Sequence, residues 1–219
     1  MPDAPYTPPV READDPEYAA NLRRATLAST VGSALEYYDF ALYGLASALI
    51  FSKLFFSNLD PGTALVASFA TFGVGFVARP LGGLFFGTIG DKLGRKWVLV
   101  ATILLMGGSS TLVGALPTFD TIGIWAPILL VFLRLCQGFG AGAEQAGSTV
   151  LMAEYAPVER RGFFAALPFI GIQGGTLLAA MVFVYLGTIP EDILLGWVWR
   201  IPFLASILLI LVALFIRMR

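Results

Sequence analysis

The chain has 219 residues, of which 57% are hydrophobic and 13% charged, and its formal net charge is −1. Soluble domains carry about 25% charged residues, so this composition excludes an ordinary soluble protein and indicates a membrane protein. The single cysteine excludes an internal disulfide, and the absence of histidine removes the commonest metal ligand, so we expect neither a metal site nor a cofactor.

The first segment, residues 1–25, contains five prolines and mixed charges but no apolar block. Such a segment cannot bury enough apolar surface to fold, and it lacks the apolar core of a signal peptide. It is predicted to be a disordered cytoplasmic tail.

Six long apolar runs follow, within residues 26–217. They occupy residues 26–50, 63–89, 97–116, 124–152, 163–186 and 197–216. A helix of ~20 residues crosses a hydrocarbon core of ~30 Å, and these runs are too long for the strands of a membrane barrel. The predicted fold class is therefore all-α transmembrane, a six-helix bundle.

The basic residues predict how this bundle is oriented. Ten lie on one side of the predicted spans and two on the other: Arg11, Arg23, Arg24, Lys92, Arg95, Lys96, Arg160, Arg161, Arg217 and Arg219 against Lys53 and Arg200. Because basic loops stay inside, both termini are expected in the cytoplasm, and the protein in a bacterial-type inner (plasma) membrane.

Five ionisable residues lie within the spans: Glu36, Asp39, Arg79, Arg134 and Glu144. Each costs at least ~2.5–3.5 kcal/mol at the bilayer centre unless it is paired or hydrated. Static ion pairs are one explanation for such residues. Five of them together favour a polar cavity between helices, because function is the usual reason for charge inside a membrane.

The fourth span displays its polar residues on one face. At 100° per residue, Arg134, Gln137 and Glu144 fall within an arc of about 100°. We therefore predict that Gln137 belongs to the same cavity as the charged residues.

Residues 87–96 (Gly-Thr-Ile-Gly-Asp-Lys-Leu-Gly-Arg-Lys) form the tight connection between the second and third spans. Gly87 is expected to permit close helix contact, and Gly94 to supply a positive φ for the reversal. Asp91 can bond free amides at a helix N-terminus. A plain charged turn is the alternative, but this order of residues is more specific and resembles the loop between helices 2 and 3 of the major facilitator superfamily.

Three further motifs resemble one branch of that superfamily, the metabolite:proton symporters. They are residues 32–40 (Gly-Ser-Ala-Leu-Glu-Tyr-Tyr-Asp-Phe), 78–83 (Ala-Arg-Pro-Leu-Gly-Gly) and 199–203 (Trp-Arg-Ile-Pro-Phe). Tyr37 departs mildly from the pattern, since tryptophan is common there. The resemblance implies the N-terminal six-helix half of a transporter, possibly built as two inverted three-helix repeats. Known members carry organic acids or zwitterionic compatible solutes with protons.

The resemblance also implies roles for single residues. Residues 134–142 (Arg-Leu-Cys-Gln-Gly-Phe-Gly-Ala-Gly) are similar to the helix 4 motif, whose arginine, here Arg134, is associated with proton coupling. In the loop, Asp91 and Arg95 are expected to act as a conformational switch with Glu154 at the inner end of helix 4. For Glu154 an ordinary helix-end carboxylate is the alternative.

The expected function is proton-coupled symport of a small organic acid or compatible solute. One bundle cannot enclose a site, so a homodimer or a second six-helix half is expected as partner, besides solute, proton and lipid; a truncated sequence is the other explanation. The alternative function is a non-transporting membrane scaffold or assembly subunit. No nucleophile–base pair indicates an enzyme, and nothing indicates a nucleic acid partner.

The charge count favours a proton step, since three carboxylates and two arginines can exchange between −1 and neutral. Like charges one turn apart disfavour joint ionisation of Glu36 and Asp39. Asp39 lies deeper from the cytoplasmic side, so it is expected to carry the proton ahead of Glu36, and Glu144 ranks third because Arg134 on the same span favours its ionised form. Arg79 and Arg134, or one of them, are expected to bind a substrate carboxylate.

Overall fold

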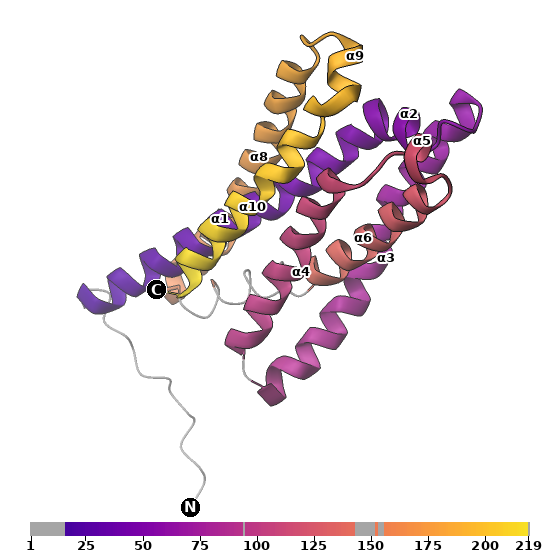
Figure 1. Cartoon of the computed structure of the whole chain (residues 1–219). Coiled ribbons are helices and arrows are strands. Elements are labelled where there is room, and N and C mark those ends of the chain that lie inside the picture. Colours follow the sequence, from indigo (N-terminus) through magenta and orange to yellow (C-terminus); the bar gives the residue numbers. More distant parts are fainter. Residues whose placement is uncertain (1–15, 94, 143–151, 153–155, 219) are drawn as a thin grey trace, which may run out of the picture.

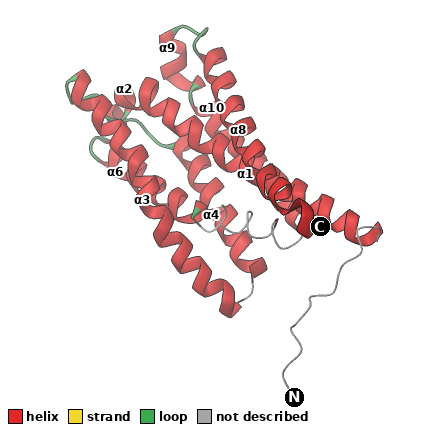
Figure 2. Cartoon of the chain, turned by 180° about the vertical axis from the view of Figure 1, so that it is seen from behind, coloured by secondary structure: helices red, strands yellow, loops and turns green. Residues whose placement is uncertain are grey.

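The computed structural model describes residues 16–93, 95–142, 152 and 156–218, and this part of the chain is helical with short connections and no strand (Figures 1 and 2). Its long helices are α1 (Pro16–Ala46), α3 (Pro61–Leu93), α4 (Arg95–Ala115), α6 (Trp125–Ala141), α8 (Arg161–Leu186) and α10 (Arg200–Met218). Each of them overlaps one of the six predicted apolar runs.

Three stretches of the described residues are long and apolar enough to cross a membrane by length and composition: Pro61–Gly90, Arg161–Leu186 and Glu191–Val212. Val100–Ala115 and Trp125–Ala141 form shorter apolar helices. The outer surfaces of these helices carry apolar side chains such as Val77 and Val184, which are 70% and 74% exposed. Such surfaces are unfavourable in water and suited to lipid.

Helix α1 begins earlier than the sequence predicts. It starts at Pro16, so the predicted disordered tail is wrong for residues 16–25. Proline is favoured at the first helical position, and Glu17 in the first turn complements the positive end of the helix dipole. The helix continues beyond Ala46 through a π-helical turn (Ser47–Phe51) into α2 (Ser52–Leu54).

The helices pack in a pattern with internal symmetry. The main neighbours are α1 with α8 and α10, α6 with α3 and α4, and α4 with α10. Exchanging α1 with α6, α3 with α8 and α4 with α10 reproduces the same set of neighbours. This pattern agrees with the predicted division into two three-helix repeats.

Glycine pairs one turn apart bring the two principal interfaces close together. On α6, a Cβ added at Gly138 or Gly142 would collide with a backbone carbonyl of α3. On α8, Gly171 and Gly175 press in the same way against the carbonyls of Thr30 and Ala34 in α1. Small residues at these points let the helix backbones approach directly.

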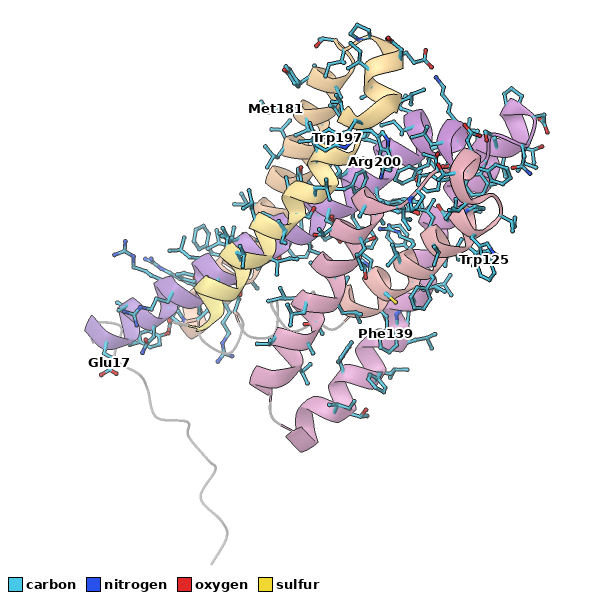
Figure 3. All side chains as sticks on the ribbon, viewed as in Figure 1. Glu17, Trp125, Phe139, Met181, Trp197 and Arg200 are labelled. Atoms are coloured by element: carbon cyan, nitrogen blue, oxygen red, sulfur yellow. The ribbon has the colours of Figure 1, made fainter. Side chains whose placement is uncertain are left out.

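The end of the bundle that carries α2, α5 (Phe119–Ile122) and α9 (Glu191–Ile193) lies uppermost in Figure 1. Lys53 and Glu191 form an exposed ion pair of 2.5 Å there, and Arg200 donates to the carbonyls of Gly114 and Leu116 at 2.8 and 2.6 Å. Figure 3 labels Trp125 and Trp197 on the outside of the bundle, where they are 62% and 59% exposed. Exposed tryptophans are typical of a membrane–water interface.

Asp60 lies outside the spans and immediately precedes α3. The backbone amide of Thr63 donates to its Oδ1 at 3.1 Å, as expected for a residue that caps a helix N-terminus. Hydrogen bonds from Thr63 lower the pKa of Asp60, because they stabilise its ionised form.

Candidate functional site

Helix α1 carries two buried acidic residues one turn apart. Glu36 is 0% exposed and Asp39 is 3% exposed. Their partners lie on different helices and differ in charge.

Glu36 lies beside an arginine of the neighbouring helix α3. Its Oε1 is 2.9 Å from Nη2 of Arg79, and the side-chain exposures are 1% for Glu36 and 13% for Arg79. The next residue, Pro80, stands inside α3 and cannot donate the usual backbone hydrogen bond. Within this pair the carboxylate of Glu36 is buried, whereas the Arg79 side chain is slightly exposed.

Asp39 is held by neutral donors from three other helices. Ser110 of α4 and Gln137 of α6 both donate to its Oδ2, and Ser206 of α10 donates to its Oδ1 at 3.4 Å. Gln137 also donates to Ser110 Oγ at 2.6 Å. Among the described residues, no arginine or lysine nitrogen lies within ion-pair distance of Asp39.

Arg134 is connected to Asp39 by hydrogen bonds through the amide of Gln137. Its Nη1 donates to Oε1 of Gln137, one turn further along α6. Its side chain is 0% exposed, and Nε and Nη2 have no hydrogen-bond acceptor among the described residues. Gly75 of α3 leaves the space that the guanidinium fills, because a Cβ there would lie 2.5 Å from Nε.

Aromatic rings surround both buried arginines. The Cζ of Arg134 lies 4.1 Å from the ring centroid of Phe40, 4.2 Å from Tyr43 and 4.9 Å from Phe72. The Cζ of Arg79 lies 3.7 Å from the same Phe40 ring and 5.3 Å from Phe76. The negative faces of aromatic rings attract cations, most strongly where water is excluded.

The structure thus brings together five predicted residues: Glu36, Asp39, Arg79, Arg134 and Gln137. Glu144 lies outside the described residues. The sequence did not single out Ser110 or Ser206, and it gave no role to Phe40, the last residue of the 32–40 motif. Serine and phenylalanine are common in apolar helices, and only the packing of α4 and α10 against α1 brings Ser110 and Ser206 to Asp39.

The predicted loop motif is described only in part. Gly87 is exposed, and a Cβ there would have nothing within 4 Å, so the prediction of close contact at Gly87 is wrong. The close approach of α3 and α6 occurs instead at Gly82, where a Cβ would meet the Phe139 carbonyl. Gly94, Glu154 and the side chains of Asp91 and Arg95 lie outside the described residues.

A bundle of apolar helices with charged and amide side chains buried at its centre is typical of membrane transporters. A protein family described as "Sugar (and other) transporter" matches residues 25–218. The chain belongs to this family, as the N-terminal six-helix half of a major facilitator superfamily protein.

Curated relatives match over most of this chain. The shikimate transporter of Escherichia coli K12 is 47% identical over 196 residues, which are 89% of this chain and 45% of that protein. The proline/betaine transporter of the same organism is 45% identical over 197 residues, which are 90% of this chain and 39% of that protein. The chain therefore spans less than half the length of these relatives.

Solved structures confirm the predicted all-α fold. A crystal structure of a D-xylose-proton symporter matches with a TM-score of 0.75 and 21% identity, covering 90% of this chain and 47% of that one. The inward-open xylose transporter XylE from E. coli matches with a TM-score of 0.73 and 20% identity, covering 90% and 48%. At such identities the likeness concerns the fold alone.

Proposed function

We propose that this chain is half of a proton-coupled symporter for a small organic acid or a zwitterionic compatible solute. The similarity to proteins named as shikimate and proline/betaine transporters supports this substrate class. The proposed location is a bacterial-type inner membrane, with both termini in the cytoplasm. A second six-helix bundle completes the transporter.

The environment of Asp39 is the observation that carries the proton step. Serine hydroxyls can both donate and accept, so Ser110 can donate to an ionised Asp39 or accept from a protonated one. The site can therefore satisfy both protonation states with small rotations of hydroxyl hydrogens. Glu36 differs, because the guanidinium of Arg79 only donates and favours an ionised partner.

Arg79 is the better of the two arginines for binding a substrate carboxylate. Arg134 is wholly buried and donates to Gln137, whereas the Arg79 side chain is 13% exposed. The Nε of Arg79 has no hydrogen-bond acceptor among the described residues. A carboxylate that replaced Glu36 on Arg79 would gain bidentate contacts and leave Glu36 to move.

The loop after α3 has a proposed role in switching between conformations. Asp91 and Arg95, with Glu154, hold the cytoplasmic helix ends together in the outward-open state. Changing Asp91 to asparagine should slow transport sharply and leave substrate affinity within a few fold. A tenfold loss of affinity with normal cycling would contradict this role.

The proposed function is tested with protein isolated from its membrane in mild detergent together with the bundle that completes it. Proteoliposomes are given labelled shikimate, proline or betaine, with and without an inside-alkaline pH gradient. Accumulation that requires the gradient supports symport. Binding without any uptake, or neither, favours the scaffold function instead.

A further inference from the structure

The ring of Phe40 contacts both arginines of the site. Arg79 from α3 and Arg134 from α6 place their Cζ atoms 3.7 and 4.1 Å from its centroid. An approach this short lies over the face of a ring and not beyond its edge, since the ring carbons and hydrogens prevent it in the ring plane. Phe40 is 3% exposed, so water does not weaken these contacts.

The two guanidinium groups depend on this ring because their hydrogen bonding is incomplete. Arg134 uses Nη1 for Gln137, while its Nε and Nη2 have no acceptor among the described residues. Arg79 approaches Glu36 through Nη2, and its Nε likewise has none. For Arg134, which has no carboxylate within ion-pair distance among the described residues, the aromatic faces are close electrostatic partners, and for Arg79 they add to the ion pair with Glu36.

Each arginine serves a different acidic residue. Arg79 pairs with Glu36, and Arg134 reaches Asp39 through Gln137. Phe40 itself follows Asp39 in α1. The charged or titratable groups that interact with these two arginines and their partners are Glu36, Tyr37, Asp39 and Tyr43 from α1, Arg79 from α3 and Arg134 from α6, while α4 and α10 face Asp39 with the neutral Ser110 and Ser206.

We propose that Phe40 is a positioning residue that links the Glu36–Arg79 pair to the Asp39 cluster by serving as the shared aromatic partner of both arginines. The Asp39 cluster consists of Asp39, Ser110, Gln137 and Ser206. A substrate that draws Arg79 away from the Phe40 ring then alters the contact between that ring and Arg134. In the other direction, a proton that binds to Asp39 alters the contact of Arg134 with the ring, and through the ring that of Arg79. The link gives the coupling between solute and proton a physical carrier. This inference rests on the proposed symport for its functional part.

Two neighbouring rings, the half-buried Phe72 and the 47% exposed Phe76, supply controls that each lie beside one arginine. Phe76 lies beside Arg79, at 5.3 Å, and Phe72 lies beside Arg134, at 4.9 Å. Both rings also contact Phe40, with centroids 5.2 and 6.3 Å from its own. Each control ring therefore occupies the same aromatic cluster but serves one arginine.

The test replaces each phenylalanine in turn by mono-, di- and trifluorophenylalanine, which weaken the negative ring face and nearly preserve its size. At Phe40, the trifluoro variant should change both substrate affinity and the proton dependence of uptake, each by about two- to fivefold, the size of a modest cation–π contact. At Phe76 only affinity should change, and at Phe72 only proton dependence. An effect at Phe40 on one property alone, or on neither, overturns the proposal.

A measurement without transport decides the shared contact independently. Each added fluorine at Phe40 should lower the thermal unfolding temperature in detergent. That loss should be smaller in the Arg79→Gln background and also in the Arg134→Gln background. A loss that is unchanged in either background overturns the shared role of Phe40. Absence of gradient-driven uptake by the unmodified protein would instead refute symport. The thermal unfolding result would then still decide whether Phe40 contacts both arginines.

Discussion

Glu36 and Asp39 are acidic residues one turn apart on α1, and both are buried, yet their surroundings are opposite in kind. Glu36 has a cation as its neighbour, at 2.9 Å, whereas Asp39 has only hydroxyl and amide donors in direct contact. A cation fixes one charge state of its partner, while amphoteric hydroxyls accommodate two. Burial alone therefore does not identify a proton carrier, because the donors around a carboxylate decide which of its protonation states are stabilised.

Removing the charge of Glu36 should have the largest effect on stability. Glu36→Gln leaves Arg79 buried without its counter-ion, which typically costs about 3–5 kcal/mol of unfolding free energy. Thermal or denaturant unfolding in detergent measures the loss. Glu191→Gln is the matched control, because it breaks the exposed pair with Lys53, and exposed pairs contribute about 0–1 kcal/mol. Equal losses in the two variants would contradict a buried Glu36–Arg79 pair.

Gln137 lies between Arg134 and Asp39, so its replacement tests the surroundings of Asp39. Gln137→Leu leaves buried polar groups of both partners unsatisfied and should cost about 1–3 kcal/mol. The control is Gln173→Leu on the exposed face of α8, which should stay within about 0.5 kcal/mol of the unmodified protein. An unchanged free energy of unfolding in Gln137→Leu would mean that the amide does not bridge Arg134 and Asp39.

Arg79→Lys keeps the charge that faces Glu36 but removes the planar fork. Affinity for a carboxylate substrate should fall about tenfold, near 1.4 kcal/mol, because an ammonium cannot reproduce bidentate geometry. Equilibrium binding of the carboxylate and of its amide analogue measures the effect. Arg160→Lys, at an exposed position, should leave both affinities unchanged. If the unmodified protein binds acid and amide equally, Arg79 does not recognise the carboxylate.

The smallest expected change in stability comes from replacing the two serines that contact Asp39, Ser110 and Ser206. Ser110 is in short contact with Oδ2, whereas Ser206 approaches Oδ1 only at 3.4 Å. Ser110→Ala should cost about 1 kcal/mol, and Ser206→Ala no more than about 0.5 kcal/mol. The two single variants are compared by thermal unfolding. The reverse order would show that Ser206 is the principal donor.

The sequence predicted the helices well, because long apolar runs leave few alternatives in a membrane. It also located the ionisable residues, since charge inside an apolar run is conspicuous. It ranked Asp39 ahead of Glu36 but could not show that their surroundings differ, because positions three apart share a helix face regardless of what the neighbouring helices present. Ser110 and Ser206 are 71 and 167 positions from Asp39, and no periodic pattern connects them to it.

Two local predictions were wrong, for different reasons. The glycine at position 87 was expected at a helix contact, but α3 and α6 meet closest near Gly82, Gly138 and Gly142. Side-chain ridges and the crossing angle set that point, and one helix alone does not reveal it. The start of α1 was missed because Pro16 ends a proline-rich segment and is also a favourable first residue of a helix.

The central claim is that Asp39, and not Glu36, carries the coupling proton, and one paired transport measurement tests it directly. Asp39→Asn proteoliposomes are assayed for accumulation driven by a pH gradient and for exchange of solute down its own gradient. The account predicts that accumulation is abolished and exchange is largely retained, while Glu36→Gln protein that remains folded still shows proton dependence. Accumulation by the Asp39→Asn protein against a solute gradient would contradict the account.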